Sequence, residues 1–416
     1  MRVGKWQRWM LSVLCVLGYL ASARGQSPIR PGDRVALVGN TYADQLRMHG
    51  YLETLLLQRS LENPVSVRNL GWAGDMLSAR DRPTNFPSEE ATLREHRTDV
   101  IVACFGMGES FAGAKGADAF REELKALIAS HRGKKYNGES EVRLILVSPI
   151  ACDDLDELTP EREERNRDLK LYKGVMGEMA GRHGIPFVNL YDRTDYLMAD
   201  PSARKLTING IRLNAYGYWA TSRMVVDQLL PGGSGWRLQV DARSGTGHGE
   251  GVEILALTTE GAGLQLVVRE ERFPIVSPSG EGATHPSLIA QSDVLLVKNL
   301  GAGSYTLTVE GKAVITAGSE EWEKGVPLAG SPAHQEAEAY RAAVNDKNLH
   351  FTYSWKALNQ VHIVGERKTS KSGRSLPAEV IAFHKLAREK EALLQGGLKL
   401  KTRTWRLVRN PDPTKK

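Results

Sequence analysis

The feature that most constrains the fold is a repeated strand-then-helix pattern between Arg34 and Leu230. Short apolar segments alternate with segments whose apolar residues follow helical spacing, and the longest expected helix, over Pro160–His183, is rich in charge. Apolar strands alternating with amphipathic helices are typical of a parallel sheet that is covered on both faces. The pattern predicts an α/β domain of about 200 residues with a doubly wound parallel sheet. The expected strands are Arg34–Gly39, Val65–Leu70, Val100–Phe105, Val142–Ile150 and Pro186–Tyr191.

The first 25 residues have the pattern of a secretory signal peptide. Arg2, Lys5 and Arg8 precede the apolar run Met10–Ala21, and Ala21–Ala23 supplies small residues for cleavage. The run is too short for a stable membrane anchor, and no later stretch approaches membrane length. We therefore expect an exported protein, periplasmic or extracellular, without a transmembrane anchor. The alternative, a buried N-terminal helix, fits the clustered positive charge less well.

The chain changes character after Pro231–Gly235, a glycine-rich segment that is typical of a linker. Between 236 and 317, short β-patterned runs separated by glycine-rich turns predict a small β-sandwich. Ser331 and Pro332 then open a helical segment over 331–397, because serine caps helices and proline is favoured at their first position. The aromatic-rich stretch His350–His362 inside this segment alternates, which favours a strand facing the core.

A basic tail over 398–416 ends the chain. The formal net charge is +6, and the last 21 residues carry seven Lys/Arg and one Asp, so the rest of the mature chain is close to neutral. A nucleic-acid-binding protein needs a basic stripe on a folded face, and none is evident, so no nucleic-acid partner is expected. The tail alternates like an edge strand or a solvated arm, and a disordered solubilising tail is the interpretation we favour.

Cysteine usage gives little further information. Only Cys104 and Cys152 remain after signal cleavage, each just past an apolar run, so a single optional bridge stays open and a disulfide-framed scaffold is excluded. The sequence has no Cys-x-x-Cys-His motif for covalent haem. We expect no cofactor and no metal.

Polar and glycine-rich segments follow the expected strands at their carboxyl ends. In an open parallel sheet the ligand crevice lies at this edge, so the segments are expected to meet there. Trp72 and Phe111 flank two of them and suit either a sugar platform or lid packing. The segments are Gly39–Thr41, Asn69–Asp75, Phe105–Ser110 and Asn209–Asn214, the last of which precedes the closing helix.

The order and spacing of these four segments resemble the conserved blocks of the SGNH/GDSL hydrolases. The resemblance covers 31–230 and implies a flavodoxin-like three-layer domain that hydrolyses acyl or carbohydrate esters. By position, the family's nucleophilic serine corresponds to Thr41, and its catalytic Asp and His correspond to Asn209 and Arg212. Its two oxyanion-hole residues correspond to Gly74 and Gly108. The crevice neighbours in this comparison are Asn40, Asp75 and Glu109.

The substitutions at these positions predict inefficient turnover. Thr41 keeps a hydroxyl, but its β-branch restricts the rotamer. Gly108 lacks the side-chain donor that the family's asparagine offers to an oxyanion. Arg212 stays charged and has no acceptor lone pair, so it cannot take a proton from Thr41. His248, in a glycine-rich loop of the second domain, is the one substitute base we consider, because His49, His96, His131 and His183 fall on or beside expected helices away from the Asn209–Asn214 turn.

Two functions remain open on the sequence. The first is ester hydrolysis of a small-molecule acyl or carbohydrate ligand, as the resemblance implies. The alternative is a non-catalytic glycan- or anion-binding or scaffold protein, because Arg212, the Gly74 amide and the Thr41 hydroxyl are all donors that suit an anion. A competing expectation is that Arg212 pairs with Glu109 or Asp75 and closes the site.

Overall fold

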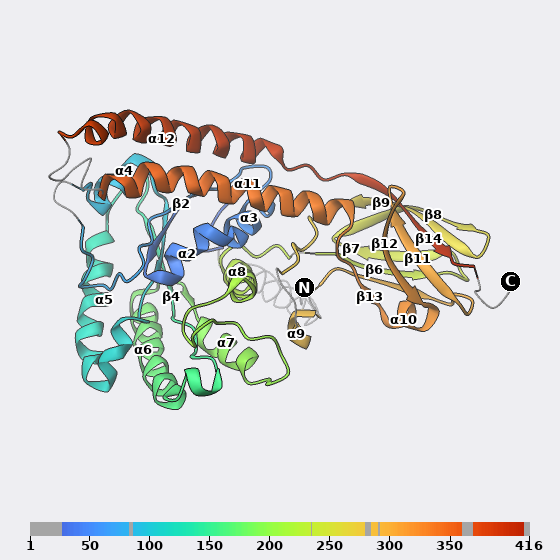
Figure 1. Cartoon of the computed structure of the whole chain (residues 1–416), viewed down its shortest axis with the longest axis horizontal. Helices are drawn as coiled ribbons and strands as arrows, with labels where there is room; N and C mark the ends of the chain where they lie inside the picture. The colour runs from blue at the N-terminus through green and yellow to red at the C-terminus, as the bar shows by residue number, and fades with distance from the viewer. Residues whose placement is uncertain are drawn as a thin grey trace, which may run out of the picture.

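A five-stranded parallel sheet organises the N-terminal half of the molecule (Figure 1). The computed structural model describes residues 27–82, 86–233, 235–278, 284–289, 292–359 and 369–411, so the predicted signal peptide over 1–25 lies outside the described residues. The strand order is β2-β1-β3-β4-β5, and every neighbouring pair is parallel. This arrangement confirms the predicted α/β class. The strands are β1 (Arg34–Gly39), β2 (Ser66–Asn69), β3 (Val100–Cys104), β4 (Arg143–Val147) and β5 (Phe187–Val188).

Helices cover both faces of this sheet because alternate strand residues point to opposite sides. On β1, Val35 and Leu37 join one apolar cluster, whereas Ala36 and Val38 join the other. The first cluster takes residues from α2, α3, α7 and α8, and the second takes them from α5 and α6. The helices of this half are α2 (Thr41–His49), α3 (Tyr51–Gln58), α4 (Glu89–His96), α5 (Ala117–His131), α6 (Arg162–His183), α7 (Leu190–Met198) and α8 (Ala215–Leu229), with short 3-10 turns at Glu109–Gly116 and Asp156–Leu158.

Two further sheets pack face to face and share one apolar core, which contains Trp236, Trp322 and Trp405. One sheet has the order β13-β10-β6-β7 and the other β12-β11-β14-β9-β8. Two of their strands, β13 and β14, lie beyond the range 236–317 in which we expected the sandwich. The elements are β6 (Arg237–Asp241), β7 (Thr246–Glu250), β8 (Val252–Glu260), β9 (Gly263–Glu270), α9 (Pro286–Ile289), β10 (Val294–Lys298), β11 (Ser304–Val309), β12 (Lys312–Gly318), α10 (Ser319–Lys324), β13 (Val326–Pro327) and β14 (Thr402–Arg409).

Two long helices, α11 (Pro332–Trp355) and α12 (Lys371–Gly397), lie side by side along the parallel-sheet half and lead to the sandwich (Figure 1). A 3-10 turn, Lys356–Asn359, follows α11. The strand expected within His350–His362 is wrong up to Trp355, because α11 continues to that residue. Phe351 and Trp355 are one helical turn apart and stack, so burial of this pair stabilises the helix. Residues 360–362 lie outside the described residues.

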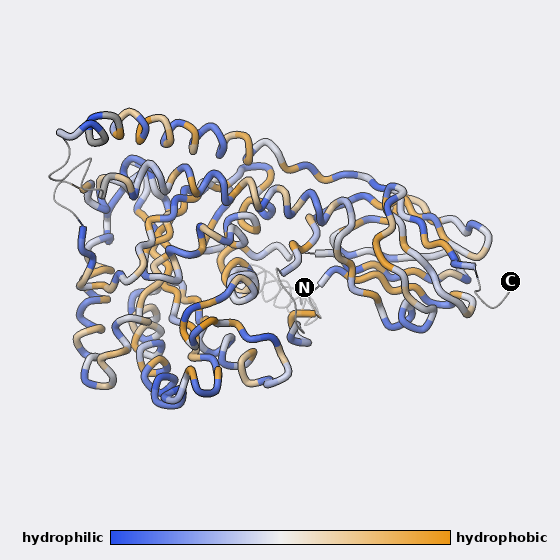
Figure 2. Tube along the Cα trace, viewed as in Figure 1, coloured by the Kyte–Doolittle hydropathy of each residue, from blue (hydrophilic) through white to orange (hydrophobic). Residues whose placement is uncertain are grey.

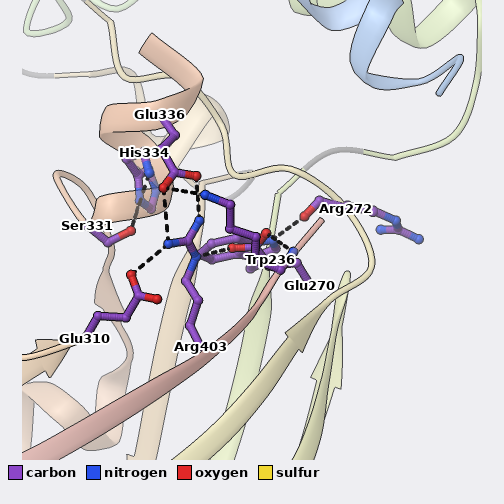
Figure 3. A network of polar contacts seen from close by, with 9 residues as sticks. Trp236, Glu270, Arg272, Glu310, Ser331, His334, Glu336 and Arg403 are labelled. Carbon is purple, nitrogen blue, oxygen red and sulfur yellow. Dashed lines mark hydrogen bonds and ion pairs between the residues drawn. The ribbon is translucent and has the colours of Figure 1, made fainter. Parts of the chain in front are cut away.

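The C-terminal tail contains a central strand. The expectation of an edge strand, a solvated arm or a disordered tail is wrong over 402–409, because β14 lies between β9 and β11. Trp405 and Leu407 alternate into the core with Arg403, which is 3% exposed. Three glutamates from different elements surround the Arg403 guanidinium, as Figure 3 shows, and they compensate its burial. They are Glu270 at 2.6 Å, Glu310 at 2.9 Å and Glu336 at 2.7 Å.

Apolar residues concentrate on the strands of the parallel sheet and inside the sandwich (Figure 2). Within the described ranges, no helix has the length and hydropathy needed to cross a bilayer.

Candidate functional site

A small crevice of about 190 Å³ lies at the carboxyl edge of the parallel sheet, where the strand-end segments meet the turn before α8. Its lining confirms that the first three segments and the Asn209–Asn214 turn come together. Asn209 and Glu109 are not among the lining residues, although they belong to these segments. The expected residues that do line it are Asn40, Thr41, Gly74, Asp75, Gly108 and Arg212.

Thr41 is placed by the end of β1 and the start of α2. Gly39 has φ +140°, and a Cβ there would lie 2.1 Å from the carbonyl oxygen of Cys104, so only glycine lets β1 pass this close to β3. Asn40 caps α2, since its Oδ1 accepts from the backbone N–H of Tyr42 at 3.0 Å. The cap fixes Thr41 as the first helical residue, with its half-buried side chain at the crevice.

Two glycines, Gly74 and Gly108, stand at the positions where we expected the oxyanion donors. Gly74 has φ +87°, and its N–H donates to Oγ1 of Thr41 at 3.4 Å. A Cβ added at Gly108 would lie 2.8 Å from Cγ of Met76, so an asparagine at Gly108 requires Met76 to move. The crevice therefore offers the backbone donor of Gly74, and Met76 occupies the space that a second, side-chain donor would need.

The turn before α8 presents Arg212 to the crevice. Oδ1 of Asn209 accepts from the backbone N–H of Arg212 at 2.9 Å and from that of Ile211 at 3.4 Å, so Asn209 holds the turn and faces its own backbone. The Arg212 side chain is exposed. No carboxylate of the described chain lies within ion-pair distance of its guanidinium. The crevice lining thus includes a positive charge that forms no ion pair with a described carboxylate.

The expected pairing of Arg212 with Asp75 or Glu109 is wrong, because both carboxylates are engaged elsewhere. Asp75 accepts from both terminal nitrogens of Arg82, at 3.0 Å and 2.7 Å. Glu109 accepts from the backbone N–H groups of Leu77 and Gly106, each at 2.9 Å, and so joins two crevice loops. Burial raises the pKa of Glu109 despite these hydrogen bonds.

No histidine lines the crevice in the described chain. The expected flexible loop around His248 is wrong, because His248 lies on β7 of the sandwich, paired in register with Gln239. His49 lies closer to the Asn209–Asn214 turn than we expected. Its ring stacks on Tyr218, 4.4 Å between centroids, and burial together with Arg341 and Arg212 lowers its pKa to about 4. His49 is eight residues after Thr41 on α2, about 12 Å along the helix axis, so it is not within reach of the hydroxyl.

The remaining wall of the crevice is apolar. Met107, Phe111 and Ile211 line it, and Phe111 is 61% exposed. The guanidinium of Arg165 lies 3.9 Å from the centroid of the Phe111 ring, which holds the ring in place. Trp72 does not line the crevice; it packs against Phe86 and Trp355. Phe111 therefore fits the platform interpretation and Trp72 fits the packing interpretation.

The two described cysteines are both buried and free, so the optional bridge is not formed. Cys104 lines the crevice, and burial raises the pKa of its thiol to about 12, so it stays protonated at neutral pH. Among the described residues, no group of three or more His, Cys, Asp or Glu side chains suits a metal ion.

A second polar constellation, which we did not predict, lies where α11 meets the sandwich. Oγ of Ser331 lies 2.6 Å from Nδ1 of His334, and Nε2 of His334 lies 2.9 Å from Oδ2 of Asp293. We call these three residues the Ser331 relay; Figure 3 shows Ser331 and His334 beside the Arg403 cluster. All three are at least 96% buried, and Asp293 also accepts from the backbone N–H groups of Trp236 and Ile275. The helix-capping Ser331-x-x-His334 spacing was the available sequence signal; Asp293 is 41 residues from His334.

Comparison with known proteins identifies the domain that contains the crevice. Residues 35–220 match the model of the GDSL-like Lipase/Acylhydrolase family. The chain contains a GDSL-like lipase/acylhydrolase domain. This match confirms the family resemblance inferred from the four segments. No curated protein matches the sequence.

One solved structure shows a similar fold over most of the chain. A gut microbial diltiazem-metabolizing enzyme is similar with a TM-score of 0.66 and 16% identity, over 92% of this chain and 99% of that chain. A catalytic mutant of an acetylxylan esterase from Geobacillus stearothermophilus has a TM-score of 0.40 and 16% identity, over 49% of this chain and 96% of its own. The similarity to the diltiazem-metabolizing enzyme extends over nearly the full length of both chains. The fold of the parallel-sheet half, the sandwich and the two long helices is therefore shared with a known structure.

Proposed function

We propose that the crevice beside Thr41 binds a small acyl or carbohydrate ligand through a carboxylate or another anionic group, and that ester hydrolysis there is slow. The GDSL-like domain belongs to an ester-hydrolase family, so small esters and their acid products are the ligands that the fold suggests. The observation that carries the proposal is a crevice with several hydrogen-bond donors and, within the described ranges, no lining histidine.

The donors suit an anion. The exposed Arg212 guanidinium has no ion pair within the described chain, and the planar fork of arginine matches a carboxylate. The Gly74 amide and the Thr41 hydroxyl, which lie 3.4 Å apart, also line the crevice. The apolar wall at Met107, Phe111 and Ile211 would then contact the body of the ligand.

Rapid hydrolysis needs a base for the hydroxyl proton. Asp75, the one carboxylate in the lining, is held by Arg82, and Arg212 has no acceptor. Slow hydrolysis through Thr41 is the second candidate function. It is supported by the position of Gly74, whose N–H is close enough to the hydroxyl to stabilise an oxyanion formed there.

Titration calorimetry with butyrate tests the binding proposal. We expect Arg212→Gln to weaken butyrate binding about tenfold, since a hydrogen bond to a charged group contributes about 1.5–3 kcal/mol. Arg193→Gln, on α7 outside the crevice, is the matched control and should bind butyrate as the unmodified chain does. Equal affinity in Arg212→Gln, or no butyrate binding by the unmodified chain, would contradict the proposal.

A further inference from the structure

A larger cavity, of about 650 Å³, lies beneath the middle of α12. Its walls come from β2 and α4 of the GDSL-like domain and from the facing parts of α11 and α12. We call it the α12 cavity. Its size falls within the roughly 300–1,000 Å³ of sites that hold small organic ligands. None of its lining residues belongs to the crevice.

The α12 cavity carries an excess of positive charge. Five lysine and arginine side chains line it, against two glutamates. Arg68 is neutralised, because both of its terminal nitrogens donate to Glu391 at 2.7 Å. Burial tends to raise the pKa of Glu391, but Arg68 outweighs burial and holds it at about 2. Arg34 on β1 and Arg388 on α12 form no ion pair in the described chain, so two guanidiniums remain without a carboxylate.

The arginine charges act on two histidines in the lining, His96 and His384, so the charges face the same space. Burial lowers the pKa of His96, and Arg68 and Arg34 lower it further. Burial also lowers the pKa of His384, where Arg388 and Arg68 oppose the effect of Glu95. Arg68 thus acts on both rings, while Arg34 and Arg388 each act on one. The three guanidiniums come from β1, β2 and α12, so the positive field is built by separate elements around one space.

The rest of the lining is apolar or aromatic. Phe351, Trp355, Val380 and Ile381 contribute to it. Trp355 is 9% exposed, and its buried Nε1–H has no hydrogen-bond acceptor among the described residues. A buried donor without an acceptor costs about 1–3 kcal/mol, so an acceptor oxygen from a ligand would be favourable beside it.

We propose that the α12 cavity binds a small phosphate or sulfate ester with an apolar body. A tetrahedral oxyanion offers acceptor oxygens in several directions, which suits guanidiniums that approach from different walls better than the two coplanar oxygens of a carboxylate do. The apolar body packs against Phe351, Trp355 and Ile381. The site is separate from the crevice and does not depend on its function.

Calorimetry on the full chain tests the site with four probes: 4-nitrophenyl phosphate, 4-nitrophenyl sulfate, inorganic phosphate and neutral 4-nitrophenol. We expect one or both esters to bind, inorganic phosphate to bind at least tenfold more weakly, and 4-nitrophenol not to bind. The ester that binds more tightly identifies the phosphate or the sulfate as the preferred group. Arg388→Gln and Arg34→Gln should each weaken the ester about tenfold.

Arg374→Gln is the matched control, because it removes the same charge from α12 outside the cavity lining. It should leave ester binding unchanged. A second readout is the NMR titration of His384, whose pKa should rise when the ester is bound, since an anion favours the charged ring. The proposal is overturned if neither ester binds, if Arg388→Gln binds as tightly as Arg374→Gln, or if the pKa of His384 is unmoved by a saturating ester.

Discussion

The crevice at Thr41 and the Ser331 relay each contain some of the groups that a hydrolytic site needs. The crevice is open, with a half-buried hydroxyl beside the Gly74 amide, but no histidine lines it in the described chain. The relay has a serine, a histidine and an aspartate within hydrogen-bonding distance, yet it is buried between α11 and the sandwich. The three residue types are those of a hydrolase triad, but the ring nitrogens are exchanged. Ser331 contacts Nδ1 and Asp293 contacts Nε2, whereas in serine hydrolases the serine contacts Nε2 and the aspartate contacts Nδ1.

This difference shows that neither a hydroxyl nor a hydrogen-bonded triad makes a catalytic site alone. Nucleophilic catalysis needs a base within hydrogen-bonding reach and space for the substrate's reacting atom. In the described chain the crevice lining contains no histidine, and the relay is buried. Ser331 caps α11, and Asp293 accepts from two backbone N–H groups of the sandwich, so the relay joins the helix to the sheet.

Restoring a base to the crevice should have the largest effect. The variant Thr41→Ser, Asn209→Asp, Arg212→His is expected to hydrolyse 4-nitrophenyl acetate roughly 10²-fold faster than the unmodified chain, because a positioned general base contributes about 10²–10⁴-fold. Initial rates at pH 7.5 measure it. Gly108→Asn is omitted because of the close contact with Met76.

The control for this variant is the same set of changes with Ser replaced by Ala at residue 41. It should show no gain. An unchanged rate of 4-nitrophenyl acetate hydrolysis in the restored variant would mean that the Gly74 side of the crevice does not stabilise an oxyanion. It would contradict the interpretation that only the base is missing.

Breaking the relay should lower the stability of the fold and leave the structure of the crevice unchanged. Asp293→Ala leaves the buried N–H groups of Trp236 and Ile275 and the His334 ring without their acceptor. We expect the free energy of unfolding to fall by about 3 kcal/mol, since each buried unsatisfied group costs about 1–3 kcal/mol. Urea unfolding measures it, and Ser331→Ala, which removes the cap, should cost about 1 kcal/mol. A loss below that of Ser331→Ala would show that the relay is not a structural junction.

The acid dependence of stability offers a smaller test near the crevice. The folded chain holds the pKa of His49 at about 4, below its ordinary value of 6.5, so neutral His49 contributes stability above pH 6.5 that is lost as the pH falls towards 4. His49→Gln should therefore reduce the fall in Tm between pH 6.5 and pH 4. Arg212→Gln should raise the pKa of His49, measured by NMR titration, because the positive charge of Arg212 helps to lower that pKa. An unchanged His49 pKa in Arg212→Gln would show that the Arg212 charge does not act on the His49–Tyr218 stack.

The parallel sheet and the crevice could be predicted because their signals are local. Each strand is a continuous apolar run, and the first three crevice segments follow strands directly, whereas the Asn209–Asn214 turn directly precedes α8. The glycine at Gly39 and the cap at Asn40 are likewise local, so the position of Thr41 followed from adjacent residues. The four segments also indicated the family, which the family model over residues 35–220 confirms.

The errors concern contacts between distant parts of the chain. β14 looked like a solvated tail because the glutamates that compensate Arg403 lie on other elements. Arg212 was expected to pair with Asp75, but Arg82 occupies that carboxylate. The relay was missed because Asp293 is remote from α11 in the sequence. Such partners depend on tertiary packing that periodicity and spacing do not encode.

The central claim is that the crevice has lost the proton transfer on which its family depends. The most direct test compares 4-nitrophenyl acetate hydrolysis by the unmodified chain and by Thr41→Ala, at equal concentration and pH 7.5. We predict that the two rates are equal within twofold, because no base acts on the Thr41 hydroxyl. A rate that falls tenfold or more in Thr41→Ala would contradict the claim and establish Thr41 as a working nucleophile.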